Sequence, residues 1–192
     1  MQEKVVDILE IATAKVTTIV CVTTNGATNA RGDAVMGTGV ARDLAIQHPE
    51  LPMQLGTMIK RNGNVVNLLK ELDHGRVLIY SFPVKPANRR CRHRSELVAN
   101  FEKWRKFQVG DYYPGWMFVA DLELIGRSCD QLVAAVAEHG AREVYLPRPG
   151  CGAGERSYLE DVKPILEAKL HDTDTTTYFI CAEDASEFGA LN

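Results

Sequence analysis

The feature that most constrains the fold is an apolar, β-branched run that leads through a turn into a glycine-bearing helix start. Residues 18–23, Thr-Ile-Val-Cys-Val-Thr, are nearly continuous in apolar character, which favours a buried strand. Asn25-Gly26 then marks a turn, and residues 35–41, Val-Met-Gly-Thr-Gly-Val-Ala, open into a helical pattern over 40–47 that should stop before Pro49. A buried strand followed by a helix predicts an α/β sheet.

The same alternation continues along the chain. Further strands are predicted at 4–9, 64–70, 76–82, 143–147 and 176–182, and further helices at 52–60, 95–107 with Ser95 as N-cap, 120–138 and 157–170. Residues 83–94 show neither the helical nor the strand periodicity of apolar residues. We expect one domain over 1–182, with a candidate insertion at about 95–117 and a fraying tail at 183–192.

Composition excludes several classes of protein. The 192 residues, 45% hydrophobic and 24% charged, are typical of an ordinary globular domain. No apolar run approaches the roughly 18 residues of a membrane helix, and the N-terminus lacks the pattern of a secretory signal. We therefore expect a cytoplasmic protein with no membrane partner. The net charge of −3 gives no global reason to expect nucleic acid.

The five cysteines are widely spread and form no CxxC pair, so the sequence supports neither a disulfide framework nor a zinc site. Cys91 and His93 could offer two metal ligands, but tetrahedral zinc usually needs four. We expect no metal and no cofactor.

Two glycine-bearing loops point to a phosphate ligand. Glycine lets the backbone pass close to a ligand, and a helix N-terminus offers free N–H donors and partial positive charge. The first loop, at 35–41, precedes a predicted helix, and the second, at 149–154, follows the predicted strand 143–147. Because ligands of α/β sheets lie at the carboxyl ends of strands, the two loops suggest a diphosphate held between them.

Five motifs in order resemble the macrodomain family, whose fold is three-layer α/β/α with a mixed central sheet and binds ADP-ribose. The motifs lie at 6–9 (Val-Asp-Ile-Leu), 20–26 (Val-Cys-Val-Thr-Thr-Asn-Gly), 35–41, 82–85 (Phe-Pro-Val-Lys) and 146–154 (Leu-Pro-Arg-Pro-Gly-Cys-Gly-Ala-Gly). The chain is similar to the branch that contains terminal ADP-ribose glycohydrolases, DNA-ADP-ribose glycohydrolase antitoxins and phage or yeast-type ADP-ribose 1″-phosphate phosphatases.

The resemblance implies a set of ligand-binding residues. Asp7 would accept a hydrogen bond from the adenine amino group, Asn25 would face the distal ribose, and the two glycine loops would enclose the diphosphate. The full implied set is Asp7, Ile8, Thr24, Asn25, Met36, Gly37, Thr38, Gly39, Val40, Pro149, Gly150, Cys151, Gly152, Ala153 and Gly154.

The resemblance also implies that Lys85 lies beside the ribose C1″, where it would act as an amine or as a cation. Glu155 is a candidate general acid or base, and Asn25 a further catalytic candidate. Two departures stand out, because Gly154 replaces the family's common aspartate and Pro86 replaces the aromatic that often follows the lysine. Cys151 has no partner base nearby in sequence, so we interpret it as a small residue in a tight loop.

The segment 85–94 carries five permanent cations, namely Lys85, Arg89, Arg90, Arg92 and Arg94. It is either a solvated face or a basic rim that grips a 1″-phosphate or a nucleic-acid backbone.

Three functions stay open from the sequence. The first is a hydrolase that removes a phosphate, an ADP-ribosylated side chain or base, or an acetyl ester at C1″ of ADP-ribose. The second is a non-catalytic reader of ADP-ribose, and the third is a nucleotide- or RNA-binding module that uses the basic stretch. The expected partners are ADP-ribose or a derivative of it, including ADP-ribosylated protein or nucleic acid.

Overall fold

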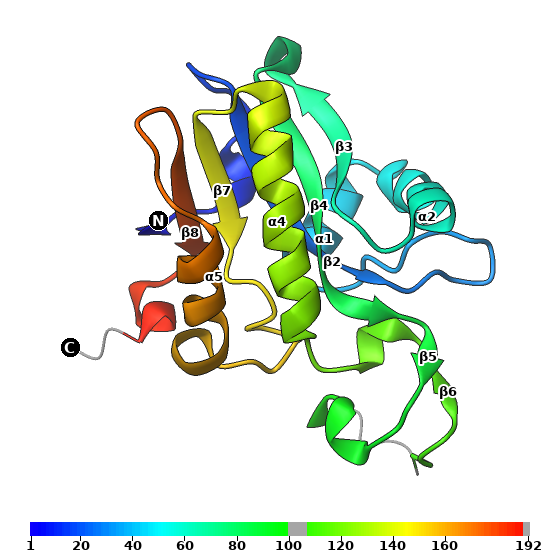
Figure 1. Ribbon diagram of the computed structural model, residues 1–192. Coiled ribbons are helices and arrows are strands. Elements are labelled where there is room, and N and C mark those ends of the chain that lie inside the picture. The colour runs from blue at the N-terminus through cyan, green and yellow to red at the C-terminus, as the bar shows by residue number, and fades with distance from the viewer. Residues whose placement is uncertain (100–106, 190–192) are drawn as a thin grey trace.

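The computed structural model describes residues 1–99 and 107–189, and its centre is a six-stranded sheet in the order β1-β8-β7-β2-β4-β3 (Figure 1). The strands are β1 Gln2–Val5, β2 Thr18–Gly26, β3 Asn67–Leu72, β4 Val77–Ala87, β7 Glu143–Pro147 and β8 Thr177–Ala182. Each neighbouring pair is parallel except β3 with β4, which is antiparallel. The sheet is therefore mixed, as predicted, and the carboxyl ends of five strands share one edge.

Helices cover both faces of the sheet. The helices α4 Leu122–His139 and α5 Lys163–Lys169 lie on one face, and α1 Gly39–Gln47 and α2 Leu51–Asn62 lie on the other (Figure 1). Alternation along β2 supplies both cores, since Ile19 and Cys21 pack with α4 and α5 whereas Val22 packs with α1 and α2. This arrangement confirms the three-layer α/β/α prediction.

Local signals set most helix ends where the sequence predicts them. The carboxylate of Asp121 caps α4 by accepting the N–H of Leu124, and Gly140 ends it in the left-handed conformation. The helix α1 stops at His48, directly before Pro49, and α2 stops at Gly63. The first strand is shorter than predicted, because the chain turns at Asp7 into a 3₁₀ turn.

The region after Lys85 differs from the prediction. Strand β4 continues to Ala87, and β5 Arg89–Arg90 then pairs with β6 Tyr112–Tyr113 in a two-stranded antiparallel sheet below the edge of the main sheet (Figure 1). We call the described residues 88–99 and 107–118 the side lobe. It has its own small core, made of Cys91, Leu97, Phe107, Tyr113, Met117 and Phe118.

Of the helix predicted at 95–107, residues 95–98 are not α-helical, whereas Ala99 is helical. A single 3₁₀ turn, Arg94–Glu96, is capped by His93 rather than Ser95. Leu97 then bridges Phe118, so pairing with a distant segment overrides the local helical pattern. Residues 100–106 of that prediction lie outside the described residues.

Of the tail predicted at 183–192, residues 183–189 form a capped turn rather than a frayed end, and residues 190–192 lie outside the described residues. Asp184 and Glu187 form a reciprocal capping box around the 3₁₀ turn Ala185–Phe188. Phe188, 9% exposed, packs edge-on against Tyr158, and Glu187 forms an ion pair with Arg148. An aromatic anchor and an ion pair therefore dock this segment onto the domain.

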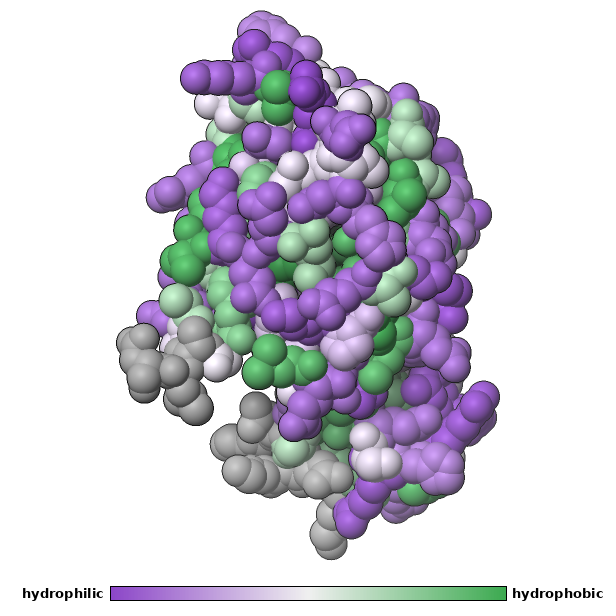
Figure 2. All heavy atoms as spheres, turned by 60° about the vertical axis from the view of Figure 1, so that its left-hand side comes forward, coloured by the Kyte–Doolittle hydropathy of each residue, from purple (hydrophilic) through white to green (hydrophobic). Residues whose placement is uncertain are grey.

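Among the described helices, none combines the length and apolar character needed to cross a membrane. On the face drawn in Figure 2, hydrophobic residues lie in small groups between hydrophilic ones, as on an ordinary protein surface.

Candidate functional site

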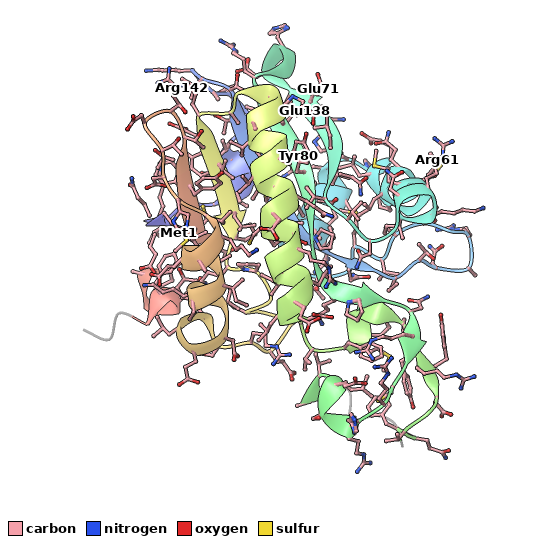
Figure 3. The ribbon with its side chains drawn as sticks, viewed as in Figure 1. Met1, Arg61, Glu71, Tyr80, Glu138 and Arg142 are labelled. Atoms are coloured by element: carbon pink, nitrogen blue, oxygen red, sulfur yellow. The ribbon has the colours of Figure 1, made fainter. Side chains whose placement is uncertain are left out.

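A cavity of about 640 Å³ lies at the edge where the five parallel strands end. Its lining includes Asp7 after β1, Glu183 after β8, Arg148 after β7, Asn25 in β2 and Lys85 in β4. The five strands whose ends line it span four spacings of about 4.8 Å, about 19 Å in all, which suits an extended ligand. Figure 3 shows Arg142, Glu138 and Glu71 at the opposite end of the sheet.

The N-terminus of α1 lines the middle of the cavity. Gly37, Thr38, Gly39 and Val40 all contribute to the lining, and Thr38 is the N-cap with no side-chain capping bond. The first N–H groups of a helix have no intrahelical acceptor and carry partial positive charge. A Cβ at Gly37 or Gly39 would meet nothing within 4 Å, so ligand atoms can approach this backbone closely.

The second glycine loop lines the same cavity. The N–H groups of Gly152, Ala153 and Gly154 donate no hydrogen bond to any residue that the structure describes. Gly152 is open to the cavity, whereas a Cβ on Gly154 would lie 2.4 Å from the carbonyl oxygen of Gly150. The cavity therefore presents two sets of backbone donors, which together suit a bound anion such as a diphosphate.

Lys85 lies at the β4 end of the cavity, in register with Asn25 across a β-bulge. The side chain is buried, and its Nζ donates to the carbonyl oxygens of Trp116 at 2.9 Å and Ala153 at 2.6 Å. Burial lowers the pKa of Lys85 to about 8, against the opposing effect of the Glu155 carboxylate. A buried cationic group aimed into a cleft with a perturbed pKa is typical of a functional site.

Asn25 lines the cavity, but its amide also shapes the first loop. Its Nδ2 donates to the carbonyl of Val35 at 2.8 Å, and its Oδ1 accepts the N–H of Ala27 at 2.9 Å. These bonds hold residues 27–35 together at the turn, so Asn25 links strand β2 to the loop that leads into α1.

Carboxylates gather at the other end of the cavity. One oxygen of Asp7 accepts the N–H of Leu9 at 2.9 Å, and the other accepts no hydrogen bond from the described residues. Glu183 and Glu187 also line this end, where Glu187 pairs with Arg148. This end therefore favours a hydrogen-bond donor over a phosphate.

The structure brings most of the implied ligand set to the cavity, namely Asp7, Ile8, Thr24, Asn25, Gly37, Thr38, Gly39, Val40, Gly150, Gly152, Ala153 and Gly154, together with Lys85. Met36, Pro149, Cys151 and Glu155 lie outside the lining.

The residues outside the lining have other contacts. Met36 packs against the core under α1 and α2. Burial raises the pKa of the Cys151 thiol to about 11, which disfavours the nucleophilic thiolate. The carboxylate of Glu155 points to the side lobe, where it accepts the N–H of Ala99 at 2.8 Å.

Sequence reasoning missed Arg148, Glu183, Glu187, Val84 and Trp116 as lining residues. Arg148 and Glu183 directly follow β7 and β8, so the rule that ligands lie at carboxyl ends of strands could have indicated them. Trp116 is brought to the cavity by the fold of the side lobe, for which the sequence carries no comparable signal.

The basic stretch divides into paired and unpaired arginines. Arg89 pairs with Glu96 at 3.2 Å and lies 4.2 Å from the centroid of the Phe118 ring, so it holds the lobe together. Arg90 donates to the carbonyl of Gly110 at 2.7 Å. Arg92 and Arg94 are exposed, and their guanidinium groups have no partner among the described residues.

No protein-family model matches the chain, and no curated protein matches its sequence.

Solved structures do match. The macrodomain of Mycobacterium tuberculosis DarG is 19% identical with a TM-score of 0.62, covering 94% of this chain and 95% of that chain. The macrodomain of Thermus aquaticus DarG is 22% identical with a TM-score of 0.60, covering 94% of this chain and 97% of that chain. Thermosipho africanus DarTG in complex with ADP-ribose is 18% identical with a TM-score of 0.57, covering 87% of this chain and 38% of that chain. At these identities the likeness shows the fold, which is that of a macrodomain.

Proposed function

We propose that this chain, with its macrodomain fold, binds ADP-ribose along the cavity at the sheet edge. The observation that carries the proposal is the pair of backbone donor sets, in the α1 N-terminus and in the second glycine loop, that line one cavity. A volume of about 640 Å³ falls within the usual range for a small-molecule site. The similar fold of the Thermosipho africanus complex, which holds ADP-ribose, supports the same ligand.

The chemistry of the lining sets the direction of the ligand. The free carboxylate oxygen of Asp7 would accept the adenine 6-amino group, and the diphosphate would lie against the N–H groups of the two loops. The distal ribose would then lie at the Asn25 and Lys85 end, because that end is farthest along the strand order from Asp7. This orientation brings C1″ to the one buried lysine of the described lining.

We further propose that the protein hydrolyses the bond between C1″ and its substituent. Water supplies a hydroxyl group to C1″ and a proton to the leaving group, so the products are ADP-ribose and the free substituent. With a pKa of about 8, about nine tenths of Lys85 is charged at pH 7. Two of its N–H groups are held by the carbonyls of Trp116 and Ala153, and the third would stabilise charge on the leaving group.

The substrate proposed is an ADP-ribosylated nucleic acid. The guanidinium groups of Arg92 and Arg94, which have no partner among the described residues, favour it over a protein substrate, since the side lobe touches Lys85 through Trp116 and so lies beside the proposed C1″ position. Exposed arginines without carboxylate partners suit a phosphate backbone.

The test is the variant Lys85→Ala, with Lys60→Ala, an exposed lysine on α2, as its control. Calorimetry should give an ADP-ribose affinity within about threefold of the parent, because the loops supply most of the contacts. Turnover should fall at least about a hundredfold, since a charge-stabilising group is lost. Substrates to compare side by side are ADP-ribose 1″-phosphate, an ADP-ribosyl-glutamate peptide and ADP-ribosyl-thymidine DNA.

The outcomes separate the open functions. Undiminished turnover in the alanine variant would remove Lys85 from the reaction. ADP-ribose binding without turnover of any of the three substrates would identify a reader. Binding of RNA but not of ADP-ribose would defeat the whole proposal in favour of a nucleic-acid-binding module.

A further inference from the structure

Within the described residues, the side lobe and the second glycine loop are joined at two points, of which the first is the Lys85 amine itself. At the first point, Nζ of Lys85 bridges the lobe and the loop, because it donates to the carbonyls of Trp116 and Ala153. At the second point, two residues further along the loop, Oε2 of Glu155 accepts the N–H of Ala99 at 2.8 Å.

The two points are connected inside the lobe by paired backbone. The N–H of Val98 donates to the carbonyl of Met117 at 3.0 Å, and the N–H of Val119 donates to the carbonyl of Glu96 at 2.8 Å. The segments 96–99 and 117–119 therefore run side by side. Contacts form a closed ring, from Glu155 to Ala99, across this pair to Trp116, through Lys85 to Ala153 and back along the loop.

The backbone of Glu155 is in a conformation that glycine normally adopts. Its φ is +54°, in the left-handed region, and its N–H donates to the carbonyl of Gly152 at 3.0 Å. A non-glycine residue keeps such a conformation only where its surroundings require it. At Glu155 the conformation accompanies a side chain that reaches the lobe, and the residue is not part of the cavity lining.

The contact also affects Lys85 electrostatically. The Glu155 carboxylate raises the pKa of Lys85, in opposition to the lowering by burial. The charge of Glu155 and its hydrogen bond are therefore separable properties, and a glutamine at this position would keep only the second.

We propose that Glu155 is a positioning residue, which fastens the side lobe to the glycine loop and so fixes the two carbonyls that orient the Lys85 amine. It then takes no proton from the substrate or water and touches no reacting atom. This inference rests on the proposed function only in that Lys85 is the group that acts at C1″.

The test compares Glu155→Gln, Glu155→Ala and Glu155→Gly with the parent protein. Glutamine keeps an oxygen that can accept the Ala99 N–H, so kcat should stay within about threefold of the parent. Alanine and glycine lose the acceptor, and kcat should fall at least about tenfold while the ADP-ribose Kd stays within about twofold. Glycine adopts a positive φ without steric strain, whereas alanine does not. A loss of kcat that is equal in the two variants is therefore not caused by backbone strain. Glu123→Gln, whose carboxylate is 91% exposed on α4, is the control.

Two readouts distinguish positioning from acid–base chemistry. In Glu155→Gln the part of the kcat–pH profile that reports the ionisation of Lys85 should move to lower pH, because the carboxylate charge that raises the pKa of Lys85 is gone. Amide hydrogen exchange at Ala99 should be slow in the parent and in Glu155→Gln, and faster in the alanine and glycine variants.

A glutamine variant as inactive as the alanine variant would overturn the proposal, since it would give Glu155 a proton-transfer role. Parent-like turnover in the alanine and glycine variants would overturn it as well. If the parent itself neither binds ADP-ribose nor turns over a substrate, the proposed function fails, whereas the exchange at Ala99 still decides whether the tether exists.

Discussion

The two glycine loops look alike in sequence, yet the glycines have different reasons to be there. In the first loop, a Cβ at Gly37 or Gly39 would meet no atom within 4 Å. In the second, a Cβ at Gly150 would lie 2.6 Å from the Cβ of Ala120, and one at Gly154 would lie 2.8 Å from it. Open space marks a position where a ligand can approach, whereas a clash marks a position required by packing.

The loops also differ in what they touch. The second loop contacts the Lys85 amine, because the carbonyl of Ala153 accepts a hydrogen bond from it. The adjoining Glu155 contacts the side lobe. The first loop is held by Asn25 and leads into α1, and none of its described residues forms a hydrogen bond with the Lys85 amine. The first loop is thus suited to hold the ligand alone, and the second couples ligand binding to the geometry of Lys85.

The largest effect that tests this comparison is on stability. Gly154→Ala should lower the free energy of unfolding by about 3 kcal/mol, since its Cβ would overlap the Gly150 carbonyl oxygen and backbone would have to move. Thermal unfolding measures the change. Gly37→Ala is the matched control and should leave the midpoint nearly unchanged, and equal midpoints for the two variants would contradict the division between the loops.

A second effect on stability concerns the buried amine that the second loop holds. In the folded protein the pKa of Lys85 is lowered from 10.5 to about 8, so the unfolded chain binds more protons between these values. Stability should therefore rise as the pH increases from about 8 towards 10.5, and below pH 8 the burial of the charge should cost about 3 kcal/mol.

The variant Lys85→Met removes that charge at nearly constant shape. It should be more stable than the parent at pH 7, with a difference that shrinks as the pH approaches 10. Denaturant unfolding at a series of pH values checks this. A difference that is independent of pH would mean that Lys85 is not buried as a charged group.

The smallest effect concerns affinity. Gly37→Ala and Gly152→Ala fill open positions next to the two donor sets, so each should weaken ADP-ribose binding about tenfold, or about 1.4 kcal/mol, at unchanged thermal stability. Calorimetry and thermal unfolding of the same samples give both quantities. A loss of stability without a loss of affinity would mean that these positions, too, serve packing.

Much of the fold is predictable because its signals are local. The strand at 143–147 has the predicted bounds, and the helix ended by Gly140 lies within two residues of the predicted 120–138, since apolar periodicity and a glycine cap act over a few residues. The side lobe is different, because Leu97 adopts an extended conformation only through its bridge to Phe118. Phe188 likewise needs Tyr158 as a partner before its segment can dock.

The sequence by itself determined the alternation of strands and helices and the two glycine loops, and through the resemblance it predicted Asp7 and Lys85 as residues of one ligand site. Only the tertiary structure decided which glycines face open space, that Lys85 is buried between two carbonyls, and that Glu155 points to the lobe rather than the cavity. The physical reason is distance along the chain. Burial, clashes and hydrogen bonds between Lys85 and Ala153, or Ala99 and Glu155, arise from packing of segments that no local pattern connects.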